Sequence, residues 1–150
     1  MSAALHLAKP EHLDRLLPLI AAFHAQEGLE QTDETRRDAL APLLDGSPYG
    51  AVYVVGPARA PIGYVIVTFT WSMEYGGLDA MIDELYIRPA VRGRGLAGEV
   101  LQKLARMLKD AHVHAVHLEV HADNPDAHRL YEKSGFRLRA GYQLMSRVLS

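Results

Sequence analysis

Residues 81–100 read MIDELYIRPAVRGRGLAGEV and decide the fold, because they join a strand pattern to a helix pattern through a glycine-rich turn. Residues 81–87 are mainly apolar, as in a buried strand. From Leu96 onward apolar side chains recur at helical spacing, and a second apolar strand pattern covers residues 114–120. A strand, a helix and a strand in this order predict a βαβ crossover.

The rest of the chain supplies a meander of strands and three more helices. Apolar spacing and capping residues predict helices at residues 10–26, 33–44 and from Asn124 to the stop at Gly135. Strands are predicted at residues 50–55, 62–71, 80–87 and, at the end, 142–149. We therefore expect one domain over residues 1–150, of the α/β class, with a mixed and mostly antiparallel sheet covered by helices on both faces.

Composition limits the classes of function. The 150 residues are 49% hydrophobic, which is enough for a real core, and they contain no cysteine for redox, nucleophilic or metal chemistry. A net charge of −2 gives no long-range attraction to nucleic acid or to an anionic membrane. No apolar run approaches the roughly 20 residues of a membrane span. We expect a cytoplasmic protein that uses neither nucleic acid nor a membrane as its partner.

The segment from Arg92 to Gly98 predicts a phosphate cradle. Its glycines let the backbone turn, and the first amides of the helix after it are free donors that, with the helix dipole, favour an anion. The glycine spacing also fits a dinucleotide fingerprint, with Glu119 as the ribose acid. However, residues 88–92 separate the strand from Gly93, which makes the turn too long, and the motif begins past the middle of the chain. A purely structural turn would leave two neighbouring arginines to repel each other.

Two blocks resemble the GNAT acetyltransferase superfamily. Residues 85–97, LYIRPAVRGRGLA, resemble its acyl-CoA signature, with Arg92, Gly95 and Ala97 at the core positions. The second block is carried by Asn124, Ala127, Leu130, Tyr131, Gly135 and Phe136. The order of strands and helices is similar to the superfamily over residues 5–149. The resemblance implies that the fourth and fifth strands splay apart and that acetyl-CoA binds between them.

The resemblance also assigns roles to individual residues. It implies that the pantetheine arm pairs with the backbone of the fourth strand and that the pyrophosphate rests on the loop amides. The cofactor-binding residues implied are Leu85, Tyr86, Ile87, Arg92, Gly93, Arg94, Gly95, Leu96, Ala97, Gly98 and Asn124. Tyr131 would protonate the departing thiolate, although its place on an apolar helix stripe also suits a core residue.

Asp83 and Glu84 are acids inside an otherwise apolar strand, where an unpaired carboxylate is costly. We expect one of them to be the catalytic base that deprotonates an amine. Strand alternation sends them to opposite faces and favours Asp83, whereas a bulge would favour Glu84. The alternative is a buried ion pair with Arg36 or Arg37.

The acceptor site is predicted from the acids Glu27 and Glu30, between the first two helices, and from Trp71 and Tyr75 on the opposite wall. Ordinary solvated acids and strand-end packing explain the same residues. Four histidines between residues 112 and 121 lack the partners of a metal site. We expect acetyl transfer to a small-molecule primary amine through a ternary complex, in a homodimer and without a metal. Acetylation of protein termini or lysines, or non-catalytic sensing of acyl-CoA, are the alternatives.

Overall fold

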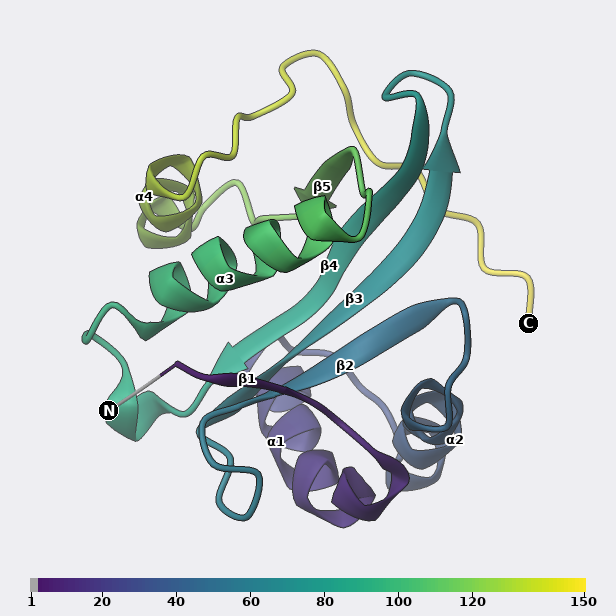
Figure 1. Ribbon diagram of the computed structural model, residues 1–150, viewed down its shortest axis with the longest axis vertical. Helices are drawn as coiled ribbons and strands as arrows, with labels where there is room; N and C mark the ends of the chain where they lie inside the picture. Colours follow the sequence, from purple (N-terminus) through teal and green to yellow (C-terminus); the bar gives the residue numbers. More distant parts are fainter. Residues whose placement is uncertain (1–2) are drawn as a thin grey trace.

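The computed structural model describes residues 3–150 and shows a sheet between two pairs of helices (Figure 1). The strands are β1 (Leu5–Leu7), β2 (Gly50–Val55), β3 (Gly63–Ser72), β4 (Gly77–Ile87) and β5 (Ala115–Leu118). The α-helices are α1 (Leu13–Gln26), α2 (Asp33–Leu44), α3 (Leu96–Asp110) and α4 (Pro125–Lys133), and short 3₁₀ turns lie at Pro10–His12 and Pro89–Val91. No helix within residues 3–150 is long and apolar enough to cross a bilayer.

The strands follow one another in the sheet in the order β1-β2-β3-β4-β5. The first three pairings are antiparallel, and β4 pairs with β5 in parallel through the α3 crossover. The predicted mixed sheet with one parallel pair is therefore confirmed. The parallel pairing is short, because it ends at Ile82 and Leu118 while β4 continues to Ile87.

Each face of the sheet has its own hydrophobic core. On one face α3 packs against β3 and β4 through residues such as Leu104, Val65 and Ile82, and α4 adds Leu130 and Tyr131 at the edge. On the other face, α1 and α2 cover a second cluster. That cluster contains Leu16, Ile20, Leu40, Val52, Val54, Tyr64, Ile66 and Tyr86. Helices on both faces are thus confirmed as well.

A β-bulge in β4 changes which residues face each core. Ile66 of β3 is opposite Glu84, but the next residue, Val67, is opposite Ile82, so that Asp83 is the extra residue. Ile82 points to the α3 face, whereas Glu84 follows the bulge and shares the α1 face with Tyr86. The simple alternation expected for Asp83 and Glu84 is therefore wrong, because the bulge inserts one residue between the two registers.

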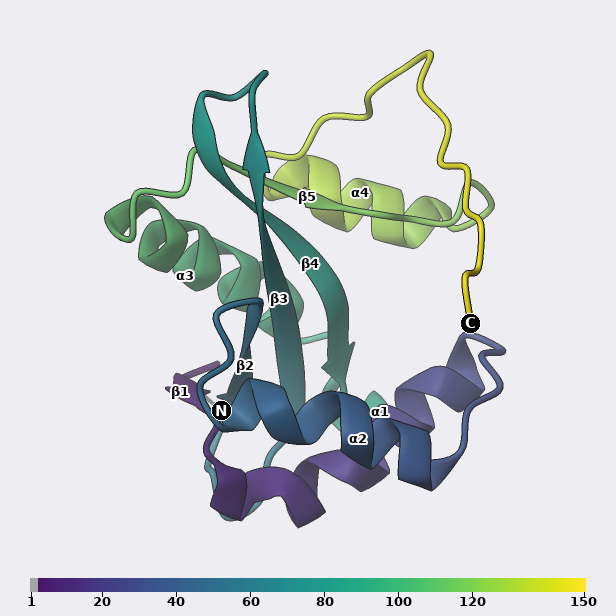
Figure 2. The same cartoon turned by 90° about the vertical axis from the view of Figure 1, so that its right-hand side faces the viewer.

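The predicted strand at residues 142–149 is also wrong. This stretch has no regular structure and runs along the outside of the molecule, away from the sheet (Figure 2). Upstream of it, Arg139 contacts Glu74 beside the β3–β4 turn, and Gly141 adopts a left-handed φ of 88° that turns the chain. Alternation of apolar residues indicates a segment that can form a strand, but a strand also needs a neighbour with free backbone groups.

Candidate functional site

The site begins where β4 and β5 separate. Beyond Ile82, residues 83–87 pair only with β3, so the β4 edge that faces away from β3 has no strand beside it among the described residues. Leu85, Tyr86 and Ile87 lie on this edge. An open strand edge offers backbone donors and acceptors to an extended ligand. The free strand edge therefore lies at the three residues for which the sequence predicted backbone pairing with the donor.

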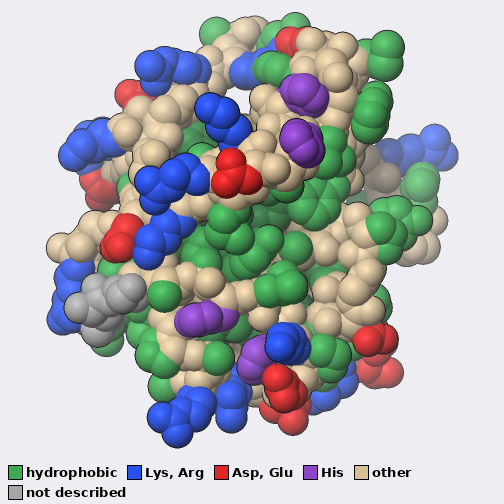
Figure 3. Space-filling view, viewed as in Figure 1, with side chains coloured by type: hydrophobic (Ala, Val, Ile, Leu, Met, Phe, Trp, Pro, Cys, Tyr) green, Lys and Arg blue, Asp and Glu red, His purple; other side chains and the backbone are tan. Residues whose placement is uncertain are grey.

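The glycine-rich loop follows at the same end of β4. Gly93 and Gly95 have left-handed φ values of 79° and 74°, and Gly95 caps α3 without a side chain of its own. Within residues 3–150 no backbone amide from Gly93 to Gly98, including those of Leu96 and Ala97, has a hydrogen-bond acceptor. Lys and Arg side chains alternate with Asp and Glu on the face that Figure 3 shows. The loop therefore presents unpaired amide donors beside the exposed Arg94, as an anion site requires.

Arg92 and Arg94 do not act as a pair. Arg92 donates through Nε to the Ile87 carbonyl at 2.8 Å and through a terminal nitrogen to Gln26 Oε1 at 2.6 Å, and it lies over the Tyr86 ring. These contacts attach the loop to β4 and to the end of α1. Arg94 is exposed and has no hydrogen bond or ion pair to the described residues. Arg94 is thus the side chain of the two that is available to a bound phosphate.

Asn124 and Tyr131 flank the open strand pair from α4. The Asn124 side-chain oxygen accepts from the Ala127 amide at 3.1 Å and caps the helix. Tyr131 is half-buried and packs edge-to-face on Phe136. Burial, followed by the negative charge of Glu27, raises the pKa of the Tyr131 phenol above its usual value. Tyr131 therefore stays protonated at neutral pH and can serve as a proton donor.

A pocket of about 160 Å³ opens between α1, α2 and the strands β3 and β4. It is lined by apolar side chains such as Ile20 and Leu40, by polar ones that include Arg36 and His24, and by both Asp83 and Glu84. The bulge explains this arrangement, since it turns Glu84 toward α1 without sending Asp83 to the opposite face. The structure thus brings together two acids that strand alternation would have separated.

Glu84 is held by neutral donors. Tyr64 donates its hydroxyl to Glu84 Oε1 at 2.7 Å, and His24 Nε2 lies 2.8 Å from Glu84 Oε2. Arg36 Nε donates to His24 Nδ1 at 3.1 Å, and a guanidinium can only donate, so the His24 proton is on Nε2 and points to Glu84. Both oxygens of Glu84 therefore accept hydrogen bonds from the protein.

Asp83 is the less restrained acid. It is exposed at the pocket and has no hydrogen bond among the described residues. Partial burial raises the pKa of Asp83 above its usual value, and the negative charges of Glu84 and Glu119 raise it further. His24 has the opposite but smaller effect. A raised pKa brings a carboxylate closer to the range in which it accepts protons effectively at neutral pH. The ion pair with Arg36 or Arg37 is not formed, because these arginines pair with Asp33 and Asp14 instead.

The predicted acceptor residues are not gathered in this pocket. Glu27 follows the end of α1, where its charge reaches Tyr131, and Glu30 is exposed in the α1–α2 loop. Trp71 is 73% exposed at the end of β3, and the Tyr75 ring packs at a tilt against the His117 ring. None of the four lines the pocket that contains Asp83 and Glu84.

Several residues in and around the pocket were not predicted as site residues from the sequence. His24, Tyr64 and Arg36 hold Glu84 directly or through one another, and Gln31, Thr35 and Thr68 line the walls. His24 lies on the apolar stripe of α1, where a polar residue indicates a buried partner. That signal marks His24 as unusual, but it does not identify Glu84 as the partner.

Known proteins resemble the chain in sequence and in structure. The model of the Acetyltransferase (GNAT) family matches residues 13–136, whereas no curated protein matches. An integron cassette protein from the mobile metagenome of Cole Harbour Salt Marsh is 26% identical, with a TM-score of 0.83 over 97% of this chain and 90% of that one.

Two further structures share the fold at lower identity. A possible acetyltransferase from Clostridium difficile 630 is 18% identical, with a TM-score of 0.85 and full coverage of both chains. A predicted acetyltransferase with acetyl-CoA from Clostridium acetobutylicum is 17% identical, with a TM-score of 0.77 over 95% of each chain.

Proposed function

The chain belongs to the GNAT acetyltransferase family, whose members use acetyl-CoA. From this premise, we propose that it transfers an acetyl group from acetyl-CoA to the primary amine of a small molecule by direct attack in a ternary complex. One observation carries the acceptor class: the bulge in β4 places Asp83 and Glu84 together at a small pocket with an apolar wall. The Arg36 guanidinium at the same pocket is paired with Asp33, so the two carboxylates remain to favour a cationic amine with an apolar segment.

The open end of β4 and the loop after it suit the acyl donor. Acetyl-CoA supplies the activated acyl group, and the free amides from Gly93 to Gly98 would hold its pyrophosphate. The backbone of Leu85, Tyr86 and Ile87 would pair with its pantetheine arm, and amides near Tyr86 would hold the developing oxyanion. Asn124 keeps its side-chain NH₂ group for the donor while its oxygen caps α4.

Asp83 is the general base in this proposal, although a bulge was expected to favour Glu84, because both acids reach the pocket and both oxygens of Glu84 already accept hydrogen bonds from Tyr64 and His24. A pH of 7 is about 3.4 units below the reference pKa of an alkyl ammonium. Removing its proton to expose the nitrogen lone pair therefore costs roughly 4.6 kcal/mol. Asp83 accepts that proton, the amine nitrogen bonds to the acetyl carbon, and the bond from carbon to sulfur breaks. Glu84 lies at the same pocket, and the hydrogen bonds from Tyr64 and His24 fix both of its oxygens in place.

Tyr131 is the general acid. The raised pKa of Tyr131 keeps its phenol protonated. Tyr131 lies on α4 and packs against the edge of the core under α3, on the side where β4 and β5 separate. Proton transfer from the phenol to the departing sulfur releases CoA as the thiol. We expect Tyr131→Phe to lower kcat by about 10²-fold or more without weakening the binding of CoA.

Release of free thiol from acetyl-CoA, screened over polyamines, aminoglycosides, amino acids and peptides, tests this proposal. We expect turnover with small amines and a loss of about 10²–10⁴-fold in kcat for Asp83→Asn. Asp38→Asn, an exposed acid on α2, is the matched control. Calorimetric titration with CoA shows whether each variant still binds the donor.

The alternatives make different predictions in the same assay. Turnover with peptides alone would identify a protein acetyltransferase, and binding of CoA without turnover over the whole panel would identify a sensor. Full activity of Asp83→Asn together with a large loss in Glu84→Gln would move the base to Glu84. Each of these results would overturn the proposal as stated.

A further inference from the structure

Arg36 brings a positive charge to the pocket of about 160 Å³ between α1, α2, β3 and β4 (the acceptor pocket). Its side chain is 11% exposed, whereas the side chain of its ion-pair partner Asp33 is 94% exposed. Asp33 does not line the acceptor pocket, and an ion pair with so exposed an acid is weakened by solvent. The acceptor pocket therefore contains one guanidinium in addition to Asp83 and Glu84.

One edge of the Arg36 guanidinium is free. Nε donates to His24 Nδ1 at 3.1 Å, and Nη1 donates to Asp33 at 2.8 Å. Nη2 has no hydrogen bond to any described residue. Since no side-chain nitrogen or oxygen within residues 3–150 is both buried and without a partner, Nη2 reaches open space. A free guanidinium edge is the group that best binds a carboxylate.

The His24 ring sets the distance between the guanidinium and the acids. Its two nitrogens contact Arg36 Nε at 3.1 Å and Glu84 Oε2 at 2.8 Å, so these two outer atoms are at most about 8 Å apart. The ammonium and the carboxylate of an α-amino acid are about 3 Å apart, and a hydrogen bond of about 2.8 Å at each end extends the span to about 8 Å. An α-amino acid therefore fits between the acids and Arg36.

The remaining wall of the acceptor pocket is suited to an aliphatic side chain. It consists of Ile20, Leu40, Leu43 and Ile66 together with Ala39. A volume of 160 Å³ is the space of about five waters, which suits a compact side chain rather than a long polyamine or linked sugar rings.

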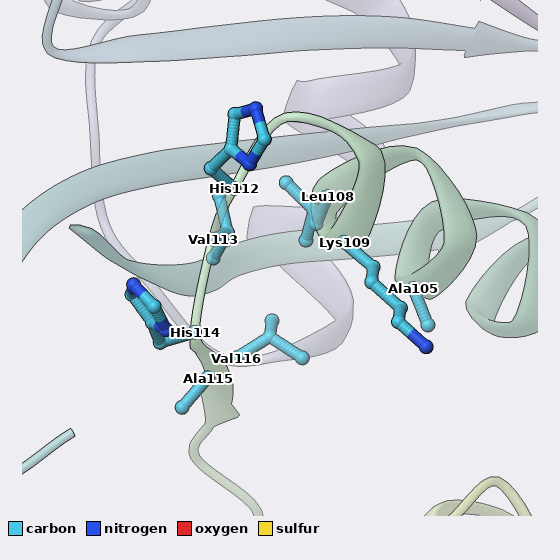
Figure 4. A pocket seen from close by; sticks show the side chains of 8 residues that line it. All are labelled: Ala105, Leu108, Lys109, His112, Val113, His114, Ala115 and Val116. Atoms are coloured by element: carbon cyan, nitrogen blue, oxygen red, sulfur yellow. The ribbon is translucent and has the colours of Figure 1, made fainter. Parts of the chain in front are cut away.

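A second depression, between α3 and β5, does not offer the same combination of groups. It measures about 550 Å³ and is lined by Lys109, His112 and His114 together with apolar side chains (Figure 4). No carboxylate lines it, so it has no group that would pair with an ammonium or accept its proton. The acceptor pocket has both of the charges that a zwitterion needs, and this depression has one.

We infer that the acceptor is an α-amino acid with an aliphatic side chain, held by its carboxylate at Arg36 and by its ammonium at Asp83 and Glu84. This acceptor class rests on the proposed function, because it names the amine of the same reaction. Asp83 takes one proton from the ammonium and passes it to solvent, the nitrogen bonds to the acetyl carbon, and the bond from carbon to sulfur breaks. The second proton that the nitrogen loses replaces the one that Tyr131 gives to sulfur. The products are the N-acetyl amino acid, CoA as the thiol and one proton.

Release of free thiol from acetyl-CoA with leucine, valine and methionine, each compared with its own amide, tests this acceptor class. We expect kcat/KM to be about 10–100-fold higher for each amino acid than for its amide, because the amide lacks the charge that Arg36 binds. A neighbouring amide group also lowers the pKa of the ammonium, so a preference for the amino acid does not come from a larger fraction of free amine. The acid 6-aminohexanoic acid, whose two charges are too far apart for this gap, should react no better than the amides.

Arg36→Gln separates the contact with the carboxylate from a structural role of the same side chain. The ratio of kcat/KM for leucine to kcat/KM for leucinamide should fall by about 10–100-fold. Damage to the fold would lower both values and leave their ratio unchanged. Arg37→Gln is the matched control, because Arg37 is the next residue on α2, pairs with Asp14 and does not line the acceptor pocket. It should leave the ratio as in the wild type.

Two results would overturn this acceptor class while acetyl transfer to amines stands. One is a kcat/KM for the amides or for polyamines that equals or exceeds that for the amino acids, and the other is an unchanged ratio in Arg36→Gln. Absence of thiol release with every amine would instead overturn the proposed function, and the acceptor class with it. The comparison on the wild-type chain needs no variant, so a folding defect in Arg36→Gln leaves the test intact.

Discussion

Tyr64→Phe isolates the hydrogen bond that holds Glu84. Tyr64 is completely buried, and its hydroxyl donates to Glu84 Oε1 at 2.7 Å. Phenylalanine keeps the ring contacts with Phe23 and Tyr86, so no cavity forms. What is lost is one hydrogen bond to a charged group, which contributes roughly 1.5–3 kcal/mol.

We therefore expect the free energy of unfolding to fall by about 1.5–3 kcal/mol and Tm to fall by roughly 3–12 °C at pH 7. Urea and thermal unfolding, followed by circular dichroism, measure both quantities. Tyr53→Phe is the control, because the Tyr53 hydroxyl on the neighbouring strand β2 has no hydrogen bond among the described residues. Its effect should stay within about 0.5 kcal/mol.

A double-mutant cycle with Glu84→Gln completes this test. If the hydroxyl acts through the carboxylate, Tyr64→Phe should cost much less in the Glu84→Gln background, with a coupling of about 1 kcal/mol or more. An equal cost in both backgrounds, or no cost in the wild type, would refute the role given to this bond. Burial, followed by Glu84, raises the pKa of Tyr64, so the wild type should lose stability above pH 10, where unfolded tyrosine releases its proton. Tyr64→Phe should lack that contribution.

Four other substitutions have definite expected outcomes. Gly95→Ala should lower the free energy of unfolding by about 1–2 kcal/mol, because the φ of Gly95 is 74°. Gly98→Ala should raise it by about 0.5–1 kcal/mol, because Gly98 lies in the first turn of α3 and the nearest atom to an added Cβ is 3.8 Å away. Urea unfolding of the two variants measures both changes. Asp83 has a raised pKa, so it stabilises the fold only in acid and loses that contribution as pH rises from about 3.8 through the raised value. Asp83→Asn should accordingly be more stable than the wild type at pH 7 but not in acid. It should also lack the fall in kcat/KM at acidic pH. Equal free energies of unfolding for the variant and the wild type at pH 7 would contradict this. Thr32→Ala removes the cap that accepts from the Thr35 amide at 3.0 Å and should cost about 1 kcal/mol in urea unfolding, and an unchanged midpoint would show that the cap contributes nothing.

Local patterns in the sequence were enough to determine most of the elements and the glycine-rich loop. Apolar spacing located the helices to within a few residues, since an amphipathic stripe reports the face that a helix must bury. The conformation of residues 92–98 could be predicted from these residues alone, because left-handed glycines and free helix amides depend only on a short segment of the chain. The mixed sheet followed from the order of these elements.

Only the tertiary structure decided how the two acids are arranged and where the C-terminal segment lies. The bulge at Asp83 is a mismatch between β3 and β4, and neither strand shows it alone. Glu84 meets His24 across 60 positions of the chain, so the contact depends on how α1 packs on the sheet. Residues 142–149 have the pattern of a strand, but a strand forms only where another edge is free to pair with it, and no local pattern specifies that edge.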